Sequence, residues 1–153
     1  MYIHLIQKHF IQMRLEDEIQ QKEFKDAYNK ATVNILFTHS YIVTKQNSFL
    51  KPFGLSPEQY NVLRILRGQN GNPITVSSIQ DRMLNKMSNA SRLVEKLKQK
   101  GLVIRNECPA DRRQVDIIIT DKGLDLLNQL QQEILNQNQN LIKLDASEVD
   151  QLN

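Results

Sequence analysis

The clearest hydrophobic pattern in the chain lies in residues 88–101, where apolar side chains recur at i, i+3, i+4 and i+7. These positions are Ala90, Leu93, Val94 and Leu97. The spacing gives a helix one apolar stripe, and the glycine that follows is typical of a helix C-terminus. The opposite face carries hydroxyls, amides and cations: Ser88, Asn89, Ser91, Arg92, Glu95, Lys96 and Gln99. The stretch predicts an amphipathic helix whose polar face is either only solvated or suited to binding DNA.

Two shorter helices are predicted before this stretch. Ser56, Pro57 and Gln59 form a capping-box pattern, which predicts a helix that runs to Gly68. Thr75 is the expected N-cap of the next helix, and a break follows at residues 84–87. The inward residues are Tyr60, Leu63, Leu66, Val76, Ile79 and Met83. Short helices joined by a tight turn, with cations on the last one, indicate a helix-turn-helix.

After Gly101 the pattern changes from helical to extended. Residues 102–104 and 115–119 are rich in β-branched side chains and flank a polar hairpin at residues 106–114, which predicts a two-stranded wing. Thr120 and Gly123 then open a helix with apolar positions at Leu124, Leu127, Leu130, Ile134 and Leu141. A capping box at residues 145–148 predicts a last helix that reaches Asn153, and we expect the native chain to extend further.

A long helical pattern precedes these elements, at residues 24–49. Its apolar stripe is long for a helix within one small domain, so the helix either bends near residues 38–40 or continues into a partner subunit. We expect a homodimer, because one small lobe cannot bury this stripe. The stripe consists of Phe24, Ala27, Tyr28, Ala31, Ile35, Ile42 and Phe49.

Positive charge is concentrated beside the central helix. Residues 82–113 hold nine Lys or Arg residues and three Asp or Glu residues, a local net charge of +6, whereas the whole chain carries +3. A basic block in a nearly neutral chain indicates a face that binds a polyanion.

Other function classes find little support in the sequence. Cys108 is the single cysteine, so no intramolecular disulfide is possible and we expect a cytoplasmic protein. No apolar run approaches the roughly 20 residues of a membrane span. The three histidines lack metal-ligand spacing, and no glycine-rich phosphate loop is present. We therefore expect no enzyme activity, no metal, no cofactor and no membrane association.

The segments LSPEQYNVL, ITVSSIQDRM, SNASRLVEKLKQKGLVIR and ADRRQVDIIITDKG together resemble the MarR family of winged-helix regulators. The resemblance covers residues 24–152 and is strongest over residues 55–123. It implies a mostly α fold with a small β-wing (α+β), in which a winged helix-turn-helix lobe at about 55–120 lies between dimerisation helices at about 13–50 and 121–153. Residues 1–153 are then one domain that forms a homodimer.

The resemblance also implies roles for individual residues. Ser88, Asn89, Ser91, Arg92 and Lys96 match the face that reads bases and contacts phosphates in the major groove. In the wing, Arg113 is expected to enter the minor groove, Asp111 to orient it, and Arg112 to contact a phosphate. Cys108 lies in the wing rather than near the N-terminus, so a role in redox sensing is not expected.

The predicted function is that of a sequence-specific transcriptional regulator that binds double-stranded DNA. We expect a ligand-responsive repressor that binds a palindromic operator as a homodimer, with a small-molecule effector between the dimer helices and the DNA lobe. One alternative is a winged helix that binds another protein. The other alternative is the dimerisation domain of an enzyme. The length of the chain speaks against it, because no residues remain for a catalytic domain.

Overall fold

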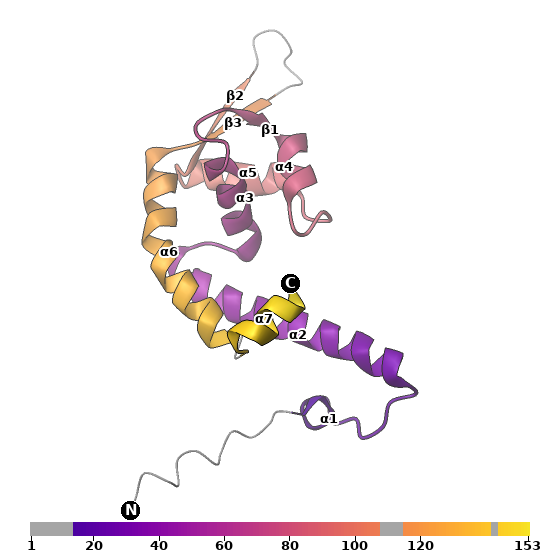
Figure 1. Ribbon diagram of the computed structural model, residues 1–153. Helices are drawn as coiled ribbons and strands as arrows, with labels where there is room; N and C mark the ends of the chain where they lie inside the picture. The colour runs from indigo at the N-terminus through magenta and orange to yellow at the C-terminus, as the bar shows by residue number, and fades with distance from the viewer. Residues whose placement is uncertain (1–13, 108–114, 142–143) are drawn as a thin grey trace, which may run out of the picture. The chain divides into compact units, whose positions relative to one another are not determined.

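The computed structural model describes residues 14–107, 115–141 and 144–153 (Figure 1). The chain forms two compact units, residues 1–44 and 45–153. The long helix α2 (Ala27–Leu50) begins in the first unit and ends in the second.

The first unit contains α1 (Leu15–Glu18) and most of α2. An ion pair of 2.6 Å between Glu16 Oε1 and Lys30 Nζ joins the two helices. The sequence pattern did not predict α1, and α2 starts three residues later than the predicted residues 24–49. Several apolar side chains of α2 are exposed in the single chain, including Tyr28, Ile35 and Leu36.

The second unit is a small helical lobe with a sheet at one side (Figure 1). After η1 (Lys51–Phe53) its elements are α3 (Pro57–Arg67), β1 (Ile74–Thr75), α4 (Val76–Arg82), α5 (Ala90–Gln99), β2 (Val103–Glu107), β3 (Val115–Ile119), α6 (Asp121–Leu141) and α7 (Ala146–Leu152). The capping box of Ser56 and Gln59, the Thr75 cap and the capping box of Asp145 and Glu148 are confirmed.

The sheet differs from the predicted two-stranded wing in two ways. Its order is β1-β3-β2, because Ile74 and Thr75 add a third antiparallel strand beside Ile117 and Asp116. Strand β2 also continues to Glu107, which pairs with Val115, whereas the prediction placed residues 106 and 107 in the hairpin. The prediction ended the strand where its apolar residues end. The observed strand continues through Asn106 and Glu107 because their backbones pair with β3 while their polar side chains can face solvent.

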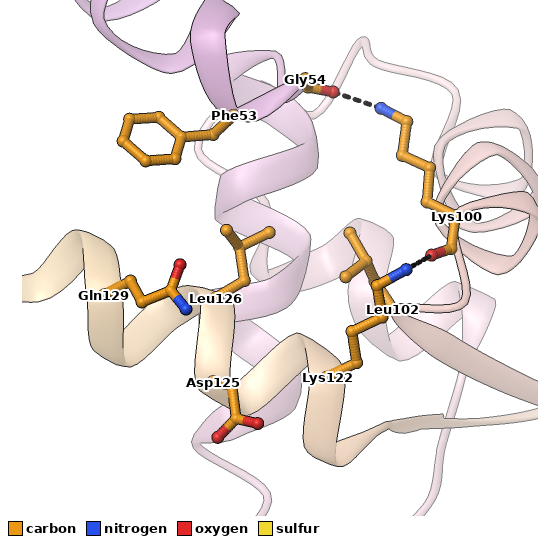
Figure 2. A pocket seen from close by; sticks show the side chains of 8 residues that line it. All are labelled: Phe53, Gly54, Lys100, Leu102, Lys122, Asp125, Leu126 and Gln129. Carbon is orange, nitrogen blue, oxygen red and sulfur yellow. Dashed lines mark hydrogen bonds between the residues drawn. The ribbon is translucent and has the colours of Figure 1, made fainter.

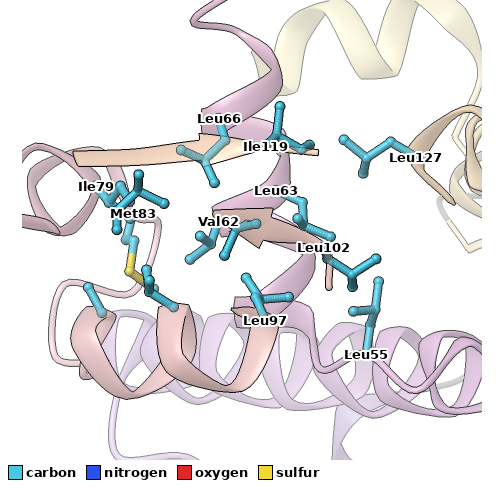
Figure 3. Packing of buried hydrophobic residues seen from close by; sticks show 14 of the residues in the cluster. Leu55, Val62, Leu63, Leu66, Ile79, Met83, Leu97, Leu102, Ile119 and Leu127 are labelled. Atoms are coloured by element: carbon cyan, nitrogen blue, oxygen red, sulfur yellow. The ribbon is translucent and has the colours of Figure 1, made fainter. Parts of the chain in front are cut away.

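One hydrophobic core unites the helices and the sheet of the lobe (Figure 3). The fully buried side chains come from α3, α4, α5, β3 and α6: Val62, Leu63, Leu66, Ile79, Val94, Leu97, Ile117, Leu127 and Leu130. Each such side chain contributes about 1.5–3 kcal/mol relative to an exposed one. The core therefore fixes α5 against α3 and the sheet, with one face of α5 left outside.

The junction between β3 and α6 depends on Gly123. A Cβ at this position would lie 2.5 Å from the carbonyl oxygen of Leu102 and 2.7 Å from Cγ1 of Ile119. The Thr120 hydroxyl donates to the Gly101 carbonyl at 2.8 Å and accepts from the Gly123 amide at 3.1 Å. These contacts join the start of α6 to the segment that follows α5.

Candidate nucleic-acid interface

Helix α5 lies within the predicted stretch 88–101 but begins later, because Ser88 precedes the helix and Asn89 is its N-cap. Of the predicted apolar stripe, Leu93 is only half-buried. Ala90, Val94 and Leu97 are buried, and Gly101 adopts a positive φ of 71°, the left-handed conformation that closes many helices. Asn89 is the N-cap, because its side chain accepts a hydrogen bond from the Arg92 amide at 2.9 Å. The apolar contacts leave the polar face of the helix on the outside of the lobe.

The predicted residues of the recognition face lie together on this helix and at its N-terminus. Asn89, Ser91, Arg92 and Lys96 are exposed, and Ser88 is half-buried. The side-chain Oδ1 of Asn89 already caps the helix. The side-chain NH₂ group is therefore the part of the amide that can still donate a hydrogen bond to a ligand. Asp111, Arg112 and Arg113 of the predicted wing lie outside the described residues.

The turn that leads into α5 is fixed by an amide that the sequence analysis missed. Gln80 on α4 accepts a hydrogen bond from the Ala90 amide at 3.1 Å and donates from Nε2 to the carbonyl of Lys86. Asn61 on α3 accepts from the Leu84 amide at 3.1 Å. Nothing near Gln80 or Asn61 in the sequence indicates these partners, since each lies in a different element from the residue it holds.

The charge of this face is mainly positive. Glu95 on α5 pairs with Arg105 on β2 at 3.3 Å, which ties the helix to the wing strand and offsets one cation. Four cations at the end of α4, in the turn that follows it and on α5 are exposed and form no ion pair with another described residue: Arg82, Lys86, Arg92 and Lys96. An unpaired group of cations beside hydroxyls and an amide suits contact with phosphates and base edges.

Residues 53–114, which span α3 to the wing, match the model of the MarR family. This part of the chain is similar to the MarR family.

A curated relative is the transcriptional regulator MhqR of Bacillus subtilis, which is 36% identical over 84 residues. That alignment covers 55% of this chain and 57% of MhqR, so the chain spans little more than half the length of this relative. The crystal structure of a MarR transcription factor from Planctomyces limnophilus has a TM-score of 0.71 and 29% identity, and the match covers 85% of this chain and 95% of that one.

A DNA complex of Sco3205, a MarR-family regulator from Streptomyces coelicolor, has the same fold, with a TM-score of 0.73 at 18% identity. That match covers 85% of this chain and 84% of Sco3205. The predicted fold class, mostly α with a small β-wing, is confirmed.

The lobe also contains a cavity of about 680 Å³ beside the residues that follow the C-terminus of α5 (Figure 2). Its walls come from η1 and the residue after it, the turn between α5 and β2, and α6. The lining residues are Phe53, Gly54, Lys100, Leu102, Lys122, Asp125, Leu126 and Gln129.

Two lysines give the cavity its polar character. The Lys100 ammonium donates to the Gly54 carbonyl and, at 3.1 Å, to Oε1 of the buried Gln59, and Lys122 Nζ donates to the Lys100 carbonyl at 2.8 Å (Figure 2). Burial lowers the pKa of Lys100 below its ordinary value, and the charge of Lys96 lowers it further. The cavity thus combines apolar walls with two cations and one carboxylate.

The described residues give no sign of a metal centre or of a membrane-spanning segment. They contain no group of three His, Cys, Asp or Glu side chains placed to hold a metal ion. None of their helices has the length and apolar character needed to cross a bilayer.

Proposed function

We propose that this chain is a sequence-specific DNA-binding transcriptional regulator, which acts in the cytoplasm as a ligand-responsive repressor on a palindromic operator. The observation that carries the proposal is the outer face of α5, where Ser91, Arg92 and Lys96 are exposed beside a capped N-terminus. A helix of this kind places small polar groups near base edges and its cations near phosphates when its N-terminal end enters the major groove.

Each residue of this face then has a role set by its chemistry. Ser88, Asn89 and Ser91 supply short donors and acceptors, and the Arg92 guanidinium can form two parallel hydrogen bonds to a guanine. Lys96 lies one turn further along α5 and contacts the phosphate backbone. In the wing, Arg112 contacts a phosphate, Arg113 enters the minor groove and Asp111 orients Arg113.

A homodimer is part of the proposal, because α2 leaves Tyr28, Ile35 and Leu36 exposed in the single chain. A second copy that packs against this helix removes those side chains from water. It also places two recognition helices at a fixed spacing, which a palindromic operator requires to be roughly 34–36 Å for half-sites one helical turn apart.

The cavity beside Lys100 is the proposed effector site. A small molecule with an apolar body and an anionic group would fit its apolar walls and lysines. The cavity contacts the turn that follows α5 and the first half of α6, so a bound molecule that favours one arrangement of these elements changes the affinity for DNA.

The experiment that tests the proposal is selection of duplexes from a random library with the purified full chain. We expect a palindromic motif, bound by two chains in sedimentation, with an affinity that falls steeply as salt is raised. Arg92→Ala should alter the selected motif at one base position per half-site. Lys51→Ala, which removes an exposed cation from η1, is the charge-matched control and should leave the motif unchanged. Enrichment of no motif, with equal weak binding to all duplexes, would contradict the proposal and favour a protein-binding winged helix.

A further inference from the structure

The turn between α4 and α5 exposes two large apolar side chains. Leu84 is 91% exposed and Met87 is 93% exposed, the two highest values among the large hydrophobic residues that the structure describes. Met83, at the start of the same turn, is buried in the core. The turn therefore points Met83 inward and leaves Leu84 and Met87 in solvent. Met87 directly precedes the residues that begin α5, so its exposed side chain is placed to contact whatever that end of the helix binds.

Hydrogen bonds hold this turn in a defined conformation. The Leu84 amide donates to Asn61 Oδ1 and the Met87 amide donates to Asn85 Oδ1, both at 3.1 Å. Gln80 donates to the Lys86 carbonyl and accepts from the Ala90 amide. The backbone on both sides of Met87 is therefore fixed, and its side chain is presented from a set position.

The neighbours of Met87 indicate which partner it meets. Met87 directly precedes Ser88 and Asn89, the residues that begin the recognition helix, and the exposed cations Lys86 and Arg92 lie close to it in the chain. This positive charge complements DNA better than it complements an apolar protein surface or a second copy of the same face. The apolar group that DNA offers in the major groove is the C5 methyl group of thymine.

We propose that Met87 is a specificity-determining residue that packs against the C5 methyl group of a thymine, beside the base pairs that the first turn of α5 reads. The inference rests on the proposed function and adds an apolar contact to its polar ones. Methionine suits the role because its unbranched, polarizable side chain adapts to the surface it meets. The preference is for thymine over cytosine or uracil at one position in each half-site.

The test uses the duplex selected with the full chain, in which each thymine is replaced in turn by deoxyuridine, so that only a methyl group is lost. We expect one symmetric pair of replacements to weaken wild-type binding by about fourfold per half-site, the value of one methyl-sized apolar contact. Met87→Gln, which keeps the length of the side chain, should bind thymine and deoxyuridine duplexes equally. Met87→Leu should retain the methyl preference.

Leu84→Ala is the matched control, since it removes an equally exposed apolar side chain from the same turn and should keep the methyl preference. Each variant is checked by thermal unfolding, where these exposed positions should leave Tm unchanged. Wild-type binding that ignores every deoxyuridine replacement, or a methyl preference that survives in Met87→Gln, would overturn the inference while leaving DNA binding intact. A change in sedimentation of free Met87→Gln would instead make the turn a contact between proteins. Selection that yields no motif would remove the proposed function and the inference together.

Discussion

Helices α5 and α2 both carry apolar side chains, but α5 buries most of its own in the core of the lobe, whereas α2 buries only Leu50 at its C-terminal end. Ala90, Val94 and Leu97 of α5 are between 0% and 2% exposed, whereas Tyr28 and Ile35 of α2 are 87% and 70% exposed. The apolar side of α5 is therefore covered by the lobe, and the N-terminal part of α2 leaves large apolar side chains in solvent. The difference separates a helix whose outer face is free to bind a ligand from a helix whose apolar face requires another protein surface.

The largest effect is expected from a charge on α2. Ile35→Asp places one carboxylate from each copy in the proposed dimer interface. Removing water from each carboxylate costs several kcal/mol of dimerisation free energy. Sedimentation at micromolar concentration should change from about twice 17.8 kDa to 17.8 kDa. The control is Leu84→Asp, at an exposed position in the lobe, which should keep the dimer mass. A dimer that persists in Ile35→Asp would show that α2 does not form the interface.

A smaller effect, but still a large one, is expected in the core of the lobe. Leu97→Ala removes a side chain that is 0% exposed and leaves a cavity, which should lower the free energy of unfolding by about 2–5 kcal/mol. Urea unfolding should show this loss at every protein concentration. Ile35→Ala should show a loss that depends on concentration, because it acts on the interface. If the two variants lost unfolding free energy with the same dependence on protein concentration, α5 and α2 would not differ in where their apolar side chains are buried.

The β3–α6 junction should tolerate even a single methyl group poorly. Gly123→Ala places a Cβ against the Leu102 carbonyl and the Ile119 side chain, and overpacking of this kind costs about 1–3 kcal/mol. Gly68→Ala is the control, since the nearest atom to its Cβ would be 3.4 Å away. Thermal unfolding of both variants measures the difference, and a Tm equal to wild type for Gly123→Ala would contradict the packing described.

The smallest effect on stability is expected for the amide that positions α5. Gln80→Ala leaves the Ala90 amide and the Lys86 carbonyl without this partner and should cost about 1 kcal/mol. Discrimination between the selected and a scrambled duplex should fall, because the first turn of α5 is less well positioned. Gln99→Ala, at an exposed position near the other end of α5, is the control. Stability and discrimination both unchanged in Gln80→Ala would show that the turn does not depend on this residue.

The sequence predicted those features that depend on neighbouring residues. Caps at Ser56, Thr75 and Asp145 involve partners within three positions, so a local pattern is enough to find them. The exposed face of α5 followed from helical periodicity in the same way. Strand β1 could not be found, because Ile74 and Thr75 form a strand only by pairing with Ile117 and Asp116.

The same reason limits what the sequence revealed about the candidate site. Gln80 holds residues six and ten positions away, and the cavity lysines bind carbonyls from separate elements, Gly54 and Lys100. Such contacts depend on how the helices pack, which periodicity does not describe. The roles of Arg112 and Arg113 remain predictions from the family resemblance.

The central claim is that the outer face of α5 reads DNA sequence, and Arg92→Ala tests it most directly. The measurement is the affinity of wild type and variant for the selected duplex and for a scrambled duplex of the same composition, at two salt concentrations. We expect Arg92→Ala to lose about 1–3 kcal/mol of binding free energy on the selected duplex, confined to one base position per half-site, with little change on the scrambled one. Lys98→Ala, which removes an exposed cation from the same helix, should weaken binding to both duplexes by similar amounts if it acts at all. Equal weakening on both duplexes by Arg92→Ala would contradict the claim that this residue reads a base.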